Sequence, residues 1–178
     1  MPRQKLHKRF IWFSQSGEPS SHENTIRISW DISSLYTNID QDLGITAVRY
    51  FLTNFPSTTC PLPIEFIIDA IIIILQGNVF TYDKNYYKQI TGVAMGTNFA
   101  PTYAILAVGY LETMLFQKCR RFFGSEIGEY IENNFVRYID DCFLKWDASF
   151  GAHTAITDLL NTLNPSITYT ETINNKSL

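Results

Sequence analysis

The sequence has few of the features that mark secreted, zinc-binding or membrane-spanning proteins. Its three cysteines, Cys60, Cys119 and Cys142, show no C-x-x-C spacing, which argues against a disulfide framework or a zinc site and favours a reducing compartment. Charged residues rather than an apolar stretch follow Met1, so no signal peptide is evident. The most apolar run, 66–75, contains Asp69 and is too short to span a bilayer, so it predicts a buried helix.

Charge is also scarce. Charged residues make up 17% of the chain and the net charge is −3, which by itself does not indicate nucleic-acid binding. Basic residues gather at the start, as Arg3, Lys5, Lys8 and Arg9. We expect residues 1–24 to form a poorly ordered basic lead, for which a solvated tail is the ordinary explanation. Residues 25–178 contain enough apolar and aromatic side chains for the core of one domain.

The hydrophobic pattern predicts a mixed order of strands and helices. We expect a strand at 25–31, helices at 41–53 and 64–76, a hairpin at 79–90, a helix at 99–122, a connection at 124–134, a second hairpin at 135–146, a helix at 152–163 and a strand at 166–171. Asn38 and Gln41 predict a capping box before the first helix. The second helix is apolar almost all round, which predicts deep burial. The order indicates an α+β fold, with an antiparallel sheet packed on helices.

Three carboxylates stand out in this pattern. Asp31 ends the first strand, and Asp140 and Asp141 lie at the turn of the second hairpin. Adjacent negative charges on a tight turn are unfavourable unless a divalent cation binds there. If the two strands are neighbours, the three carboxylates converge and can hold two ions, as in enzymes of phosphoryl transfer. Taken singly, each is more simply a solvated turn or strand-end residue.

Two further features lie near these carboxylates in the sequence. Tyr36 follows Asp31 by five residues, where its ring can pack beside a bound sugar or simply in the core. The segment 91–101 contains Gly92 and Gly96, small side chains and the start of a predicted helix. Such a segment can lie under a nucleotide or a template base, although loop glycines are the simpler interpretation.

Three stretches together resemble the motifs of the Penelope-like retroelement reverse transcriptases. Residues 31–39 (DISSLYTNI) resemble their DxxSLYTNI motif, residues 89–104 resemble the motif with a GxAMGTxxAP core, and residues 137–141 (RYIDD) resemble their YIDD box. The resemblance extends from about Ile26 to Leu178. It implies the right-hand palm of a polymerase, with fingers and thumb lying outside these residues.

The resemblance also implies roles for individual residues. Asp31, Asp140 and Asp141 would be the catalytic, metal-binding carboxylates, with the Ile32 carbonyl as an extra ligand for one of two Mg²⁺ ions, which Mn²⁺ can replace. Tyr36 would be the steric gate against a ribose 2′-hydroxyl. The residues expected to contact the incoming nucleotide and the template are Ile32, Tyr36, Met95, Gly96, Ala100 and Pro101.

The implied activity is that of an RNA-directed DNA polymerase, which adds dNTPs to a DNA primer on an RNA template. A retroelement enzyme of this kind would act in the nucleus, without a membrane, and missing fingers and thumb segments could be supplied in trans. Two alternatives stay open. One is a catalytically incompetent palm remnant that serves as a binding or assembly module. The other is a metal-dependent phosphohydrolase, which explains the carboxylates but not Tyr36 or the segment 91–101.

Overall fold

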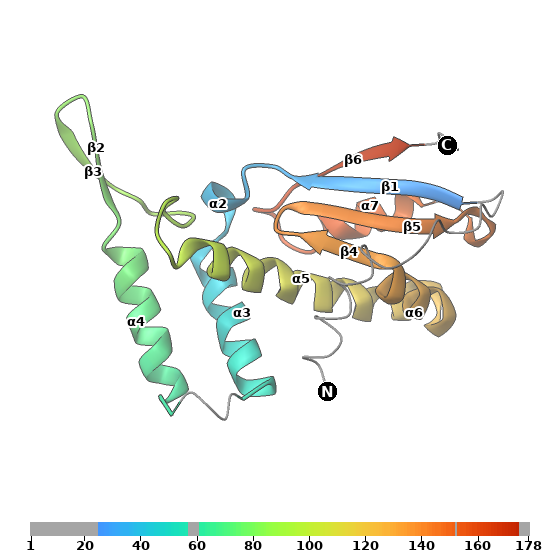
Figure 1. Cartoon of the computed structure of the whole chain (residues 1–178), viewed down its shortest axis with the longest axis horizontal. Coiled ribbons are helices and arrows are strands. Elements are labelled where there is room, and N and C mark those ends of the chain that lie inside the picture. Colours follow the sequence, from blue (N-terminus) through green and yellow to red (C-terminus); the bar gives the residue numbers. More distant parts are fainter. Residues whose placement is uncertain (1–24, 57–60, 152, 175–178) are drawn as a thin grey trace.

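The computed structural model describes residues 25–56, 61–151 and 153–174 (Figure 1). In chain order its elements are β1 (Thr25–Ile32), α2 (Leu35–Asn38), α3 (Gln41–Asn54), α4 (Ile64–Gln76), β2 (Val79–Tyr82), β3 (Asn85–Lys88), α5 (Ala100–Phe123), α6 (Ser125–Asn134), β4 (Phe135–Tyr138), β5 (Asp141–Asp147), the short 3-10 helix η1 (Ala148–Phe150), α7 (Thr154–Asn161) and β6 (Tyr169–Asn174). The basic lead predicted at 1–24 lies outside the described residues.

Four of the strands form one sheet, in the order β4-β5-β1-β6, and every neighbouring pair is antiparallel. In β1, Ile28, Trp30 and Ile32 are buried while Arg27 and Asp31 are exposed, which is the alternation expected of a half-buried strand. Asp31 therefore lies on the face of the sheet opposite Trp30.

The long helix α5 forms the centre of the helical layer. It packs against α3 and α6, and its buried side chains include the small residues Ala104 and Ala107. Close approach to α3 is possible because Gly44 faces the ring of Tyr103, whose hydroxyl donates to the Gln41 carbonyl at 2.9 Å. The chain is thus a mixed α+β protein in which an antiparallel sheet packs on helices, as the sequence predicted. In the described part of the chain, no helix is long and apolar enough to cross a bilayer.

Helix α4 is less buried than the sequence predicted. Ile68, Ile71 and Leu75 are buried, but 58% of Phe66 and 70% of Ile73 are exposed. The physical reason is that α4 and the β2–β3 hairpin extend from the rest of the described chain, with α3 as the main helical neighbour of α4 (Figure 1). A helix with one neighbour buries one stripe of side chains, whatever its overall hydrophobicity. The prediction of deep burial is therefore wrong. We call α4 and the β2–β3 hairpin together the arm.

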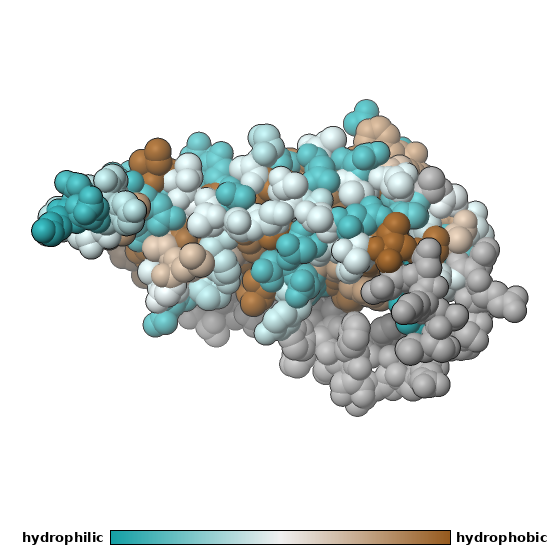
Figure 2. All heavy atoms as spheres, turned by 90° about the horizontal axis from the view of Figure 1, so that it is seen from above, coloured by the Kyte–Doolittle hydropathy of each residue, from teal (hydrophilic) through white to brown (hydrophobic). Residues whose placement is uncertain are grey.

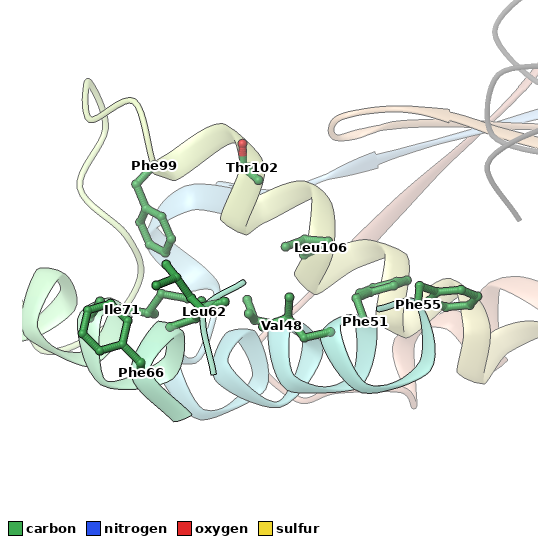
Figure 3. Close-up of a pocket in the computed structure, with 12 residues that line it drawn as sticks. Val48, Phe51, Phe55, Leu62, Phe66, Ile71, Phe99, Thr102 and Leu106 are labelled. Atoms are coloured by element: carbon green, nitrogen blue, oxygen red, sulfur yellow. The ribbon is translucent and has the colours of Figure 1, made fainter. Parts of the chain in front are cut away.

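The arm has a hydrophilic surface at one end and an apolar surface at the other. Figure 2 shows hydrophilic side chains at the projecting end of the molecule, where the β2–β3 hairpin turns. At the other end of the arm, α3, α4 and α5 enclose an open apolar hollow of about 510 Å³ (Figure 3). Its lining includes Val48, Phe51, Leu62, Phe66, Ile71 and Leu106.

Other boundaries also differ from the sequence prediction. Residues 125–134 are not a connection but the helix α6, which buries Ile131 and packs closely on α5 because Gly128 lies against Arg120. Helix α3 is capped by the side chain of Asp40, which accepts from the Asp42 amide, rather than by Asn38. Strand β6 begins at Tyr169 instead of Ser166.

Candidate functional site

The strands that carry Asp31 and Asp141 are direct neighbours in the sheet. Asp31 on β1 and Asp141 on β5 are opposite each other in the antiparallel register. Directly opposed side chains share a face of the sheet, with Cβ atoms about 4.5–5.5 Å apart. Both residues are exposed on the face turned away from the core. Like charges in this position are destabilising. The fold therefore places two carboxylates together where they repel each other unless a cation binds.

Asp140 reaches the same region from the hairpin loop between β4 and β5. A hollow of about 320 Å³ is lined by Asp31, Ile32, Ser34, Leu35, Tyr36, Thr37, Met95 and Asp140. Five residues predicted from the sequence thus lie around one hollow, although they come from three separate segments of the chain. The four other residues assigned to the site are not part of this lining: Gly96, Ala100, Pro101 and Asp141.

The predicted contacts of Ala100 and Pro101 receive no support from this geometry. Ala100 is 1% exposed and is part of the core at the start of α5, while Pro101 is exposed in the first turn of that helix. Neither residue lines the hollow. Their role toward nucleotide or template stays a prediction, as does that of Gly96.

The loop that carries Asp140 has a strained backbone. Tyr138 pairs with Asp141, so the loop consists of Ile139 and Asp140 alone. Ile139 has a φ of 55°, in the left-handed region that a β-branched residue rarely adopts. Such strain costs on the order of 1–3 kcal/mol and persists only where surrounding contacts hold it.

Arg137 provides those contacts. Its Nη1 donates to the Ile139 carbonyl at 2.8 Å, and its Nε donates to the Glu112 carboxylate at 2.5 Å. Nη2 reaches the Ile105 carbonyl at 3.4 Å. The guanidinium therefore ties the acidic loop to the middle of α5. Burial opposes its charge, but the Glu112 carboxylate more than compensates and raises the pKa of Arg137, so the guanidinium stays protonated.

A second set of backbone contacts joins the segment around Gly92 to α2. The Gly92 amide donates to the Ile39 carbonyl at 3.0 Å, and the Val93 amide donates to the Tyr36 carbonyl at 2.7 Å. Gly92 has a φ of 71°, and a Cβ there would lie 2.5 Å from the Tyr36 oxygen. Only glycine allows this close approach, which brings Met95 and Tyr36 to the same hollow.

Sequence reasoning missed the polar residues Ser34 and Thr37 in the lining and the ion pair of Arg137 with Glu112. Thr37 lies inside the motif 31–39, in which roles were predicted only for Asp31, Ile32 and Tyr36. Glu112 had no local signal at all, because it lies 25 residues before its partner in the middle of a helix.

The donor set is compatible with magnesium. Asp31, Asp140 and the neighbouring Asp141 offer carboxylate oxygens, and Ile32 lies beside them in the lining. Among the described residues, no three His, Cys, Asp or Glu side chains are grouped so that they could hold a metal ion, so Asp31, Asp140 and Asp141 do not converge as a set of three. Mg²⁺ does not require such a group, because it retains water and is usually bound by one or two carboxylates and by substrate phosphates.

Comparison with known proteins gives a likeness in structure. No family model matches the sequence, and no curated protein matches it. The fold is similar to that in the structure of apo telomerase from Candida tropicalis truncated from the C-terminal domain, with a TM-score of 0.61 and 10% sequence identity. The match covers 98% of this chain and 34% of the telomerase chain, so this chain spans about a third of that protein. At this level of identity the likeness shows a shared fold and nothing more.

Proposed function

We propose that residues 25–178 form the palm of an RNA-directed DNA polymerase related to the Penelope-like reverse transcriptases. The observation that carries the proposal is the pairing of Asp31 with Asp141 on the face of the sheet turned away from the core, beside a strained loop that carries Asp140. The fold likeness to telomerase supports it at the level of the fold. The substrates would be dNTPs, a DNA primer and an RNA template.

Each group at the hollow has a chemical task in this proposal. Asp31, Asp140 and Asp141, with the Ile32 carbonyl, would hold two Mg²⁺ ions, for which Mn²⁺ can substitute. When bound, such ions activate the attacking hydroxyl and neutralise charge on the phosphates and the leaving oxygen. Tyr36 lines the hollow next to Asp31 and would exclude a ribose 2′-hydroxyl by its bulk. Met95 also lines the hollow and would contact the incoming nucleotide.

Metal binding provides the direct test. We expect the purified chain to bind Mn²⁺, measured by electron paramagnetic resonance, and Asp140→Asn or Asp31→Asn to weaken binding by about tenfold or more, because a carboxylate ligand is lost. Asp83→Asn is the control, because Asp83 is an exposed aspartate in the loop of the other hairpin. Equal Mn²⁺ affinity in wild type and Asp140→Asn would show that the assigned site is wrong.

The exposed apolar side chains of the arm favour a second function, that of a binding or assembly module without catalysis. Phe66 and Ile73 could contact another protein segment rather than solvent. Primer extension on an RNA template separates the two functions. Extension by this chain that is abolished in Asp140→Asn would exclude the module, whereas Mn²⁺ binding without extension would favour it.

A further inference from the structure

Strand β6 borders Asp31 on the side of β1 that faces away from β5. The antiparallel register places Thr170 of β6 directly opposite Asp31, as Asp141 of β5 is opposite it on the other side. Opposed side chains share a face of the sheet, with Cβ atoms about 4.5–5.5 Å apart. Asp141, Asp31 and Thr170 therefore form one row across three strands, and all three are exposed.

Thr170 brings a hydrogen-bond donor to this row. An ionised carboxylate can only accept hydrogen bonds, whereas a hydroxyl donates one and accepts others. The hydroxyl oxygens of Thr170 and Ser33 lie 3.4 Å apart. When Ser33 donates to Thr170, the Thr170 proton is available to the Asp31 carboxylate, and the two hydroxyls form a short chain that ends at Asp31. Such a bond stabilises the negative charge that the neighbouring Asp141 destabilises.

Helix α7 fixes the position of β6 beside Asp31. β6 is the last strand of its sheet, and the outer side of an edge strand has unpaired backbone groups. Asn161 of α7 bonds both backbone groups of Tyr169, the residue before Thr170. Its Oδ1 accepts from the Tyr169 amide at 2.8 Å, and its Nδ2 donates to the Tyr169 carbonyl at 3.1 Å. These two bonds take the place of a further strand.

The residue after Thr170 is held by the same face of α7. The Thr157 hydroxyl donates to one carboxylate oxygen of Glu171, and His153 Nε2 lies 3.1 Å from the other. The Thr157 oxygen also accepts from the indole of Trp30 at 2.8 Å. The α7 contacts recur every four residues, so they come from one face of the helix. Thr170 is therefore fixed through both of its neighbours in the chain.

We propose that Thr170 is a positioning residue of the metal site, whose hydroxyl orients the Asp31 carboxylate toward a divalent cation. This inference rests on the proposed function, which makes Asp31 a metal ligand. Carboxylates that bind metals are themselves held by hydrogen bonds, and the loss of such a partner lowers metal affinity by roughly 10–100-fold. Because Thr170 is exposed and water can replace part of its bond, we expect the lower end of this range.

Thr170→Val tests the proposal, because valine keeps the shape of threonine and removes the hydroxyl. We expect the Mn²⁺ affinity of the full chain, measured by electron paramagnetic resonance, to fall about tenfold. Thr170→Ser keeps the hydroxyl and should bind Mn²⁺ within about twofold of wild type. Thr172→Val is the matched control, because Thr172 is an exposed threonine on the same face of β6, opposite Ser29 instead of Asp31. It should leave the affinity unchanged.

Two further variants separate positioning from a general structural role. Ser33→Ala removes the partner hydroxyl but leaves that of Thr170, so we expect a smaller loss of Mn²⁺ affinity, about threefold. Because Thr170 acts through Asp31, Thr170→Val should have little additional effect in Asp31→Asn, as a double-mutant cycle measures. Equal urea midpoints in Thr170→Val and Thr172→Val would show that the change in affinity does not come from lost stability.

The role of Thr170 is overturned by wild-type Mn²⁺ affinity in Thr170→Val, by equal losses in Thr170→Val and Thr172→Val, or by a tenfold loss that persists in the Asp31→Asn background. Its failure is distinct from that of the proposed function. Weakened Mn²⁺ binding in Asp31→Asn with wild-type binding in Thr170→Val would retain the metal site and reject the role of Thr170. Wild-type Mn²⁺ affinity in Asp31→Asn would instead reject the proposed active site.

Discussion

The two hairpins in the described part of the chain have loops of the same length but different surroundings. In β2–β3 the pair Tyr82 and Asn85 encloses two loop residues, and in β4–β5 the pair Tyr138 and Asp141 does the same. The first loop has positive φ at both of its residues, Asp83 and Lys84, as type I′ turns require. The second has positive φ at a β-branched residue, Ile139. The loop that carries Asp140 is therefore the more strained of the two.

Packing explains how the strained loop is held. All residues of β2 and β3 are exposed, and a stacked pair of Phe80 with Tyr87 is their main ring contact. By contrast, Phe135 is buried against the rings of Trp30 and Phe116, and Arg137 is anchored by Glu112. A strained turn requires rigid neighbours, whereas a relaxed turn can project into solvent. The difference teaches that the tertiary partners, and not the loop length, make a hairpin suitable for a site.

The largest expected difference between the hairpins is the loss of stability when a basic residue is replaced in each. Arg137→Met leaves Glu112 as an unpaired charge where its side chain is only 15% exposed, so we expect a loss of about 3 kcal/mol in the free energy of unfolding. Lys88→Met in β3 should change it by no more than about 0.5 kcal/mol, because Lys88 is exposed. Urea denaturation measures both.

The same variant tests the role of Arg137 at the loop. In folded Arg137→Met the Ile139 carbonyl loses its donor, so NMR chemical shifts should change at Ile139, Asp140 and Asp141. Arg120→Met is the control, because it removes a more exposed ion pair, with Glu132, and should cost about 1 kcal/mol or less. Similar losses of stability in Arg137→Met and Arg120→Met would contradict the anchoring that distinguishes the hairpins.

The free energy of unfolding should fall at alkaline pH, in part because the Cys142 thiol of the β4–β5 hairpin is buried. Burial raises the pKa of Cys142, and burial on α5 raises that of Cys119 to about 12. In the unfolded chain a thiol ionises near pH 8.5, so above that pH the unfolded state binds fewer protons and is favoured. Stability should therefore be unaffected by these thiols below about pH 8 and fall by about 1.4 kcal/mol per pH unit for each thiol as pH rises toward its folded pKa.

Cys142→Ala checks this expectation. Removal of one thiol should reduce the alkaline slope by about 1.4 kcal/mol per pH unit, measured from urea midpoints between neutral pH and pH 10 under reducing conditions. Thr81→Ala in the exposed hairpin removes no titratable group and should leave the slope unchanged. An unchanged slope in Cys142→Ala would mean that the thiol is not protonated and buried in the folded state.

The smallest expected effect is an increase in the local stability of the exposed β2–β3 hairpin. Asp83→Asn with Lys84→Gly installs the Asn-Gly pair that type I′ turns favour and removes the left-handed strain at Lys84. Hydrogen exchange of the β2 and β3 amides should slow by a factor that corresponds to about 0.5–1 kcal/mol, while global stability stays the same because the hairpin packs little on the core. An equal rise in global stability would show that the two hairpins unfold together.

The sequence predicted most of the elements from local signals. Alternation identified β1, and the turn residues identified both hairpins. Two errors have the same origin. Helix α4 is apolar all round, which predicted burial, but the exposure of Ile73 depends on which neighbours are present. The segment 125–134 has few large apolar residues (Ile127, Tyr130 and Ile131), and its helix is stabilised by contact with α5 through Gly128.

By itself, the sequence determined that Asp31 ends a strand on its polar face and that Asp140 and Asp141 occupy a tight turn, because alternation and turn formation depend on residues close in the chain. Only the tertiary structure decided that β1 and β5 are neighbours in a register that opposes Asp31 to Asp141 and Arg27 to Lys145. It also decided that Glu112 holds Arg137. Strand pairing and ion pairs between distant segments follow from how the whole core packs, which no local pattern contains.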